Sequence, residues 1–322
     1  MTTPQLSTTH AASEWRRRYH RMGYWYILPA VLLFVLMVAY PILRSLYLSL
    51  FDYDMLEPAR ARFAGITNYA RLFTDVPNRG AFANTLYFTL IFVPPYVIFA
   101  LVIAVMLNAV RRGSVFLRTM IFTPVVVSLG VASVMWMLFY DKQVGAVRMI
   151  VAWVDGWAVW LDANLWTGWP WRCAIPAAPL DDAKWAMIGV ALVCLWNGIG
   201  INIILFLVGL QRIPQDMYEA SRVDGAGAWQ RFWHITLPQL RPTIYLVVLL
   251  SMIGAFKIFG QPYILTRGGP EDATLTYVMR LYKVGFQYAK MQFGYASSMA
   301  YALTLFIFAM SMFMRKLRRP VN

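Results

Sequence analysis

The stretch MIGVALVCLWNGIGINIILFLV, residues 187–208, decides the fold of this chain. It carries no charged residue, and a helix of about 20 apolar residues crosses the roughly 30 Å hydrocarbon core of a bilayer. Five further runs have the same character. They lie at 24–43, 86–107, 119–139, 243–265 and 296–314. The sequence therefore predicts an all-α, polytopic membrane protein with six transmembrane helices.

The composition excludes an ordinary water-soluble enzyme. Of the 322 residues, 60% are hydrophobic and only 14% are charged. Two cysteines and three histidines are too few and too scattered to indicate a disulfide framework or a metal site. We interpret the run 24–43 as a retained span, because no small-residue cleavage pattern of a signal peptide follows it.

The net charge of +14 predicts the orientation of the chain. The segments on the N-terminal side of the spans hold 15 of the 29 basic residues and four of the 15 acidic ones, a local charge of +11. The remainder of the chain carries +3. Because cytoplasmic segments keep the positive excess, we expect both termini to be cytoplasmic, as basic tails at 1–23 and 315–322 around a membrane domain at 24–314.

Three outer loops are expected, at 51–84, 141–184 and 266–295. The second carries six tryptophans, and apolar residues between Ile150 and Leu161 recur at helical spacing. This pattern predicts a short helix in the membrane interface. Its two interpretations are an aromatic anchor and a docking surface for an outside partner. No catalytic constellation is visible in these loops.

The cytoplasmic loop 211–241 has a helical pattern of its own. Pro214 suits the first turn of a helix, Asp216 and Glu219 suit its positive N-terminal end, and Gly225 suits the left-handed residue that ends it. A second helical piece leads to Pro238. This loop has three possible interpretations: a plain structural loop, a nucleic-acid-binding element, or a helix that docks into a cleft of another protein. Its near balance of charge argues against nucleic acid.

The residues of this loop resemble the EAA motif of permease subunits of binding-protein-dependent ABC importers, in the sugar-transport, maltose-type branch. The matching positions are Glu219, Ala220, Ser221, Asp224, Gly225, Ala226 and Pro238. Similar segments at 210–214 and 265–270 extend the resemblance across about residues 20–317. Ser221 departs from the second alanine of the motif by a small-for-small change. The resemblance implies the type I permease fold and a loop that couples the permease to an ATPase.

The same resemblance implies the partners. They are a second, non-identical permease, two ATPase subunits, an extracytoplasmic solute-binding protein and membrane lipid, with no nucleic acid. The chain has no GxxxxGK[ST] phosphate loop, so ATP and magnesium are expected on the separate ATPase, with no cofactor and no enzymatic activity in this chain. The expected location is the bacterial inner membrane. The expected cargo is a sugar or sugar-like solute of the oligosaccharide, glycoside or polyol/glycerol-phosphate type.

The resemblance also places a candidate solute pathway on the fourth and fifth spans. Its residues are Asn197, Gly198, Ile201, Ser251, Gly254, Ala255, Lys257, Ile258 and Gln261. The small residues could instead serve close helix packing rather than the solute pathway. The stem of Lys257 could instead snorkel, so that its charge reaches the membrane surface.

Two other functions stay open at this point. An ion-driven secondary transporter predicts buried carboxylates in the spans and an inverted repeat, and neither is visible in the sequence. A membrane scaffold without transport would need no stoichiometric ATPase.

Overall fold

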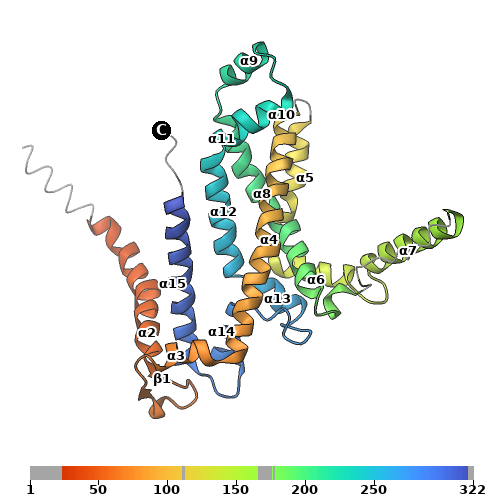
Figure 1. The fold of residues 1–322 in the computed structure, drawn as a ribbon. Helices are drawn as coiled ribbons and strands as arrows, with labels where there is room; N and C mark the ends of the chain where they lie inside the picture. The colour runs from red at the N-terminus through yellow and green to blue at the C-terminus, as the bar shows by residue number, and fades with distance from the viewer. Residues whose placement is uncertain (1–23, 111–112, 166–175, 177, 318–322) are drawn as a thin grey trace, which may run out of the picture.

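The computed structural model describes residues 24–110, 113–165, 176 and 178–317, which form a mainly helical chain. Figure 1 shows long helices side by side, and a small antiparallel pair of strands, β1 (Phe51–Asp52) and β2 (Arg62–Phe63), at one end of them. Several predicted features lie outside the described residues. These are the tail 1–23, residues 111–112, residues 166–175 and 177 of the tryptophan-rich loop, and residues 318–322 of the second tail.

The six predicted spans are confirmed as five helices and one bent helix pair. Each is long and apolar enough to cross a membrane. They are Tyr24–Ser49, Val76–Ala109, the pair Val115–Val126 with Leu129–Phe139, Ala186–Gln211, Arg241–Leu265 and Phe293–Lys316. The chain is therefore a multi-pass membrane protein.

The third span differs from the single apolar run predicted at 119–139. It consists of α5 (Ser114–Val126) and α6 (Leu129–Phe139), and the two helices are bent by 95°. Pro124 in the last turn of α5 has no N–H to donate, and Ser128 caps the new helix by accepting from the Val131 N–H at 3.4 Å. A proline followed by a capping serine accounts for the bend.

The second span, α4 (Val76–Ala109), is longer than the run that predicts it. At 1.5 Å per residue its 34 residues extend about 51 Å, beyond the roughly 30 Å of the hydrocarbon core. Its first turns therefore lie within the predicted outer loop 51–84. That segment also contains η2 (Pro58–Arg60) and α3 (Thr67–Thr74).

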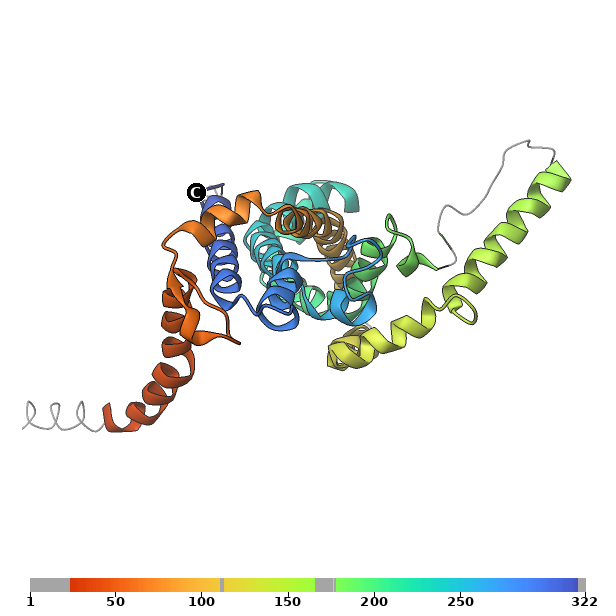
Figure 2. The same ribbon diagram turned by 90° about the horizontal axis from the view of Figure 1, so that it is seen from below.

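The first span stands at the edge of the bundle. It ends in η1 (Val35–Ala39) and α2 (Tyr40–Ser49), and none of its most apolar window is buried. Figures 1 and 2 both show α2 beside α15 (Phe293–Leu317). The hydroxyls of Ser45 and Tyr301 lie 3.1 Å apart across this contact.

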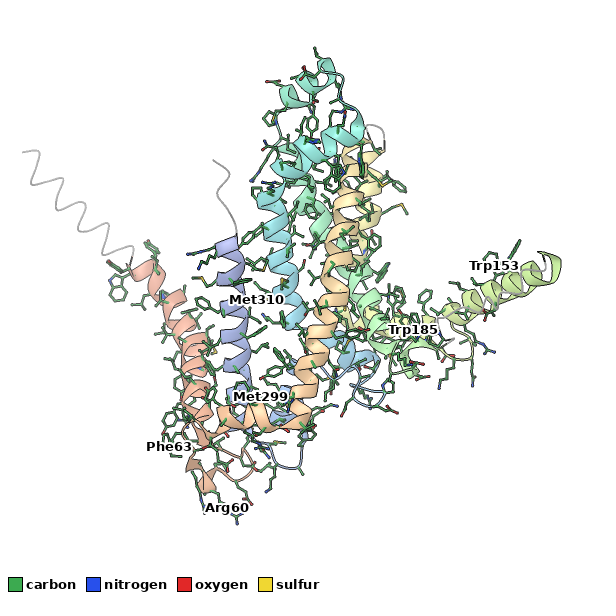
Figure 3. The ribbon with its side chains drawn as sticks, in the orientation of Figure 1. Arg60, Phe63, Trp153, Trp185, Met299 and Met310 are labelled. Carbon is green, nitrogen blue, oxygen red and sulfur yellow. The ribbon has the colours of Figure 1, made fainter. Side chains whose placement is uncertain are left out.

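The centre of the bundle is α8 (Ala186–Gln211), which packs against α4, α5 and α12 (Arg241–Phe256). Phe88, Val190, Phe206 and Val247 are fully buried there. A second apolar cluster surrounds Met299 on α15, which Figure 3 labels. Burial of such side chains supplies the packing that holds the helices together.

The remaining helices belong to the connecting segments. On the side predicted to be outer they are α7 (Ala146–Leu165), η3 (Pro179–Asp181), α14 (Tyr277–Tyr282) and η5 (Lys283–Gln287). Helix α13 (Gly260–Leu265) forms the end of the fifth span. In the predicted cytoplasmic loop they are α9 (Gln215–Val223), α10 (Ala228–Arg231), η4 (Phe232–Thr236) and α11 (Leu237–Gln239). Figure 1 shows α9 at the same end of the bundle as the C-terminal end of α15.

The helix predicted in the tryptophan-rich loop is present as α7. It projects away from the bundle, and Trp153 lies on its exposed part (Figures 2 and 3). Trp153 and Ile150 keep 65% and 61% of their surface exposed. Its placement in the membrane interface stays a prediction.

A largely buried polar network holds α4, α14 and α15 together at their predicted outer ends. One carboxylate oxygen of Asp75 accepts from the Tyr295 hydroxyl at 3.0 Å and lies 3.4 Å from the Arg280 guanidinium. Arg280 also donates to the Tyr288 hydroxyl at 2.6 Å. The side chains of Asp75 and Arg280 are only 14% and 13% exposed. Because a charge with so little contact with water is costly, each of the two charges is stabilised by the other.

We predict that Asp75→Asn destabilises the protein, because it leaves the Arg280 guanidinium largely buried without a counter-charge. The expected loss is on the order of 2 kcal/mol, below the about 3–5 kcal/mol of a fully buried pair. Thermal unfolding in detergent measures it. Asp52→Asn, at an exposed carboxylate on the same side, is the control and should leave the midpoint unchanged. Equal midpoints for both variants would contradict the assignment.

Candidate functional site

A cavity of about 420 Å³ lies where α4, α8 and the junction of α12 with α13 meet. All nine residues predicted for the solute pathway line it. Volumes of this size are typical of ligand pockets, which range over about 300–1,000 Å³. The structure thus brings these nine residues together, and their role in solute passage stays a prediction.

The α8 wall of the cavity is built on helical spacing. Asn197 and Ile201 are four residues apart and so lie on one face of the helix. Asn197 donates to the Pro124 carbonyl of α5 at 2.8 Å, and Asn202 donates to the Ser251 hydroxyl of α12 at 3.1 Å. Both amides therefore join helices in addition to lining the cavity.

The fifth span is interrupted where it reaches the cavity. Helix α12 ends at Phe256 and α13 begins at Gly260, so Lys257 and Ile258 lie in the break. The Ile258 carbonyl accepts no helical hydrogen bond there, because the residue four positions later, Pro262, has no N–H. Instead it accepts a hydrogen bond from the Thr276 hydroxyl at 3.0 Å. Non-helical backbone within a span is tolerated where it lines a cavity, and Lys257, Ile258 and Phe259 all line this one.

The α4 wall is aromatic, and the resemblance to known permeases did not predict it. Phe88 and Phe92 stack at 5.0 Å between ring centroids, and Phe92 and Tyr96 stack at 4.6 Å. All three rings line the cavity. The signal available in the sequence was three aromatic residues at four-residue intervals, which places them on one face of a helix.

Gly198 allows α4 and α8 to approach each other at this cavity. A Cβ atom on Gly198 would lie 2.6 Å from the Tyr96 hydroxyl oxygen, closer than real Cβ contacts. Gly254, on the opposite wall, has no atom within 4 Å of a built Cβ. Gly198 is thus required by packing and Gly254 is not, within this chain.

The loop 211–241 has the predicted helix, turn and second helix. Pro214 precedes α9, and Gly225 ends it with a φ of +78°. The Gly225 N–H donates to the Arg222 carbonyl at 3.1 Å, and the Ala226 N–H to the Ser221 carbonyl at 2.9 Å. These two bonds form a Schellman motif, whose left-handed residue is normally glycine.

Helix α9 has no buried residue and stands away from the bundle, as Figure 1 shows. The hydroxyls of Tyr218 and Thr236 lie 2.9 Å apart and connect it to η4. Val223 and Trp229 keep 89% and 71% of their surface exposed. The loop therefore presents apolar side chains on a part of the chain that is otherwise polar, which is typical of a docking surface.

The predicted coupling residues divide into two groups. Ser221, Asp224, Gly225 and Ala226 surround a hollow of about 410 Å³. The others lie elsewhere in the loop: Glu219 and Ala220 are exposed on α9, and Pro238 lies in α11. Among the described residues, no group of three or more His, Cys, Asp or Glu side chains could hold a metal ion.

Residues 79–321 match the family described as binding-protein-dependent transport system inner membrane component. The chain is 35% identical to the probable ABC transporter permease protein YurN of Bacillus subtilis, over 91% of this chain and 94% of that protein. It is 32% identical to the lactose transport system permease protein LacF of Rhizobium radiobacter, over 94% and 96%.

The fold is similar to that of a bacterial alginate ABC transporter, solved in complex with an alginate pentasaccharide-bound periplasmic protein. The TM-score is 0.75 with 19% sequence identity, and the match covers 98% of each chain.

We predict that Gly198→Ala destabilises the protein by about 1–3 kcal/mol, because its methyl group overlaps the Tyr96 hydroxyl. Combining it with Tyr96→Phe removes that oxygen and should restore most of the loss. Thermal unfolding in detergent measures both variants. Gly254→Ala is the matched control and should be neutral. A Gly198→Ala protein as stable as the Gly254→Ala protein would contradict the packing argument.

Proposed function

The chain belongs to the family of inner-membrane components of binding-protein-dependent transport systems, and from this premise we propose that it forms half of the pathway by which an ATP-driven importer moves a sugar or sugar-like solute. The location that accompanies this function is the bacterial inner membrane, with both termini in the cytoplasm. The chain itself acts as a permease and carries out no hydrolysis.

The cavity supports a sugar-like cargo. It combines aromatic side chains on α4 with the amides of Asn197 and Gln261, and ligand pockets typically combine an apolar lining with a few polar groups that fix orientation. The relative named for lactose transport agrees with this class. An oligosaccharide, a glycoside or a polyol of the glycerol-phosphate type fits this description.

The observation that carries the coupling proposal is the exposure of α9. A short helix with no buried side chain, ended by a glycine turn and flanked by exposed Val223 and Trp229, suits insertion into a groove of another protein. We assign that groove to a separate ATPase subunit, where ATP and magnesium are bound. Glu219 and Gly225 carry the contact.

The complete assembly contains two permeases, two such ATPases and an extracytoplasmic solute-binding protein. The binding protein delivers solute to the outward-facing pair, and closure of the ATPases moves α9. This movement reaches the cavity through the contact of Tyr218 with Thr236 and then through α12, whose C-terminal end lines the cavity. Alternating access follows from the relative movement of these helices.

An ion-driven transporter is the first competing function. The six spans, with the bounds that the structure gives them, contain no Asp or Glu to carry a proton or sodium ion. A scaffold without transport is the second, and it leaves the exposed apolar side chains beside α9 without a use. Copurification with an ATPase in equal stoichiometry separates the scaffold from the importer.

We predict that Gly225→Val abolishes ATP-driven uptake while the protein still inserts and assembles its spans. Valine at a φ of +78° costs about 1–2 kcal/mol or more and distorts the end of α9. Uptake of radiolabelled solute into proteoliposomes containing the complete importer measures the effect.

Gly227→Val is the control for this experiment. Gly227 lies in the same loop, but its φ of −68° and ψ of 167° suit any residue, so uptake should stay close to normal. Unimpaired uptake by the Gly225→Val importer would remove the coupling assignment.

A further inference from the structure

The cavity contains a charge that the proposed function does not explain. Lys257 is exposed and lies on the cavity wall, whereas the described residues of that wall include no Asp or Glu. None of the three ion pairs in the described part of the chain includes Lys257. The cavity wall therefore has a net positive charge.

Lys257 lies within the fifth span. It follows the 16 residues of α12, which at 1.5 Å per residue extend about 24 Å from Arg241. This distance is shorter than the roughly 30 Å hydrocarbon core, and α13 continues outward beyond it. Lys257 therefore lies inside the fifth span, towards its predicted outer end, and it lines the cavity. An ionisable residue within a span is by default a candidate for a functional site.

The same cavity has a wall suited to a sugar ring. Phe92 and Tyr96 line the cavity with part of their apolar ring surface, and the C–H groups on a sugar's apolar face can pack against it. Phe88 is fully buried and stacks on Phe92, so it supports this wall. Gln261, on α13, also lines the cavity, and its amide can bond hydroxyl groups. Stacking surface, amide and ammonium thus surround one space.

We propose that this permease binds an acidic sugar-like solute, with the ring against the α4 aromatics and a carboxylate or phosphate paired with the Lys257 ammonium. The proposal rests on the proposed transport function and deepens it by naming the charge of the cargo. A hydrogen bond between charged groups is stronger than one between neutral groups, so Lys257 selects the anionic form of a solute over its neutral counterpart.

The structural alternative assigns the lysine to helix α12. Lys257 caps the C-terminal end of this helix, where a positive charge complements the helix dipole. This role predicts lower stability when the charge is removed and no change in the preference between solutes. The two roles therefore differ in a measurable way.

The test is equilibrium binding of probe solutes to the assembled, nucleotide-free importer in detergent, measured by calorimetry. The probes are D-galacturonate against methyl galactoside, and sn-glycerol 3-phosphate against glycerol, so that the carboxylate and phosphate arms are separate. We expect the anion of at least one pair to bind about tenfold more tightly, and Lys257→Gln to remove this preference while Lys257→Arg keeps it. Lys184→Gln, at an exposed lysine outside the cavity, should keep it too.

A second variant tests the aromatic wall independently of charge. Phe92→Leu should weaken the anionic and the neutral member of a pair by similar factors, because apolar contact with this side chain does not depend on the charge of the solute. A thermal unfolding midpoint near that of the wild type shows that the variant is folded. Loss of anion binding alone in Phe92→Leu would contradict the assigned geometry.

Equal binding of the two members of both pairs overturns the proposal, as does a preference for anions that survives in Lys257→Gln. Absence of binding by every probe also overturns it. The transport function is judged separately by ATP-driven uptake in the Gly225→Val and Gly227→Val importers. An importer that passes that test and prefers neutral solutes keeps its function and loses only the acidic cargo.

Discussion

The close approach of α8 to its neighbours is the constraint on which the rest of the structure depends. A Cβ atom at Gly200 would lie 2.9 Å from a methyl group of Val125 on α5, and one at Gly209 would lie 2.6 Å from the Thr243 hydroxyl on α12. Two helices thus pack against α8 at distances that only glycine allows. Lipid provides no hydrophobic force that would drive apolar helices together. The helices that line the cavity are therefore held around α8 by this close packing.

The absence of water from the membrane interior governs the polar groups in the same way. Thr85 on α4 donates to the Ala81 carbonyl at 2.9 Å and accepts from the Tyr277 N–H at 2.8 Å, which connects α4 to the outer segment. Asn202 and Ser251 satisfy each other between α8 and α12. These buried polar groups therefore also help determine which helices are neighbours.

The apolar runs were sufficient to predict the six spans, because hydrophobic length is a local property of the sequence. Gly225 was predictable for the same reason, since the residues that end a helix are adjacent in the chain. The α4 aromatics were not assigned to the site, because their meeting with α8 depends on Gly198, about a hundred residues away in the chain. The break at Lys257 depends on Thr276 in another segment, and periodicity alone does not show such a contact.

This break also divides the fifth span into two mechanically different parts. The outer part, α13, is held in place: the Thr266 hydroxyl donates to the Pro262 carbonyl at 2.8 Å and lies 2.6 Å from the Thr274 hydroxyl. The other part, α12, continues from the exposed loop. No helical hydrogen bond spans residues 257–259 from α12 to α13, and such a break is a common place for a hinge. In the function proposed above, a tilt of α12 that starts in the loop changes the shape of the cavity while α13 stays in place.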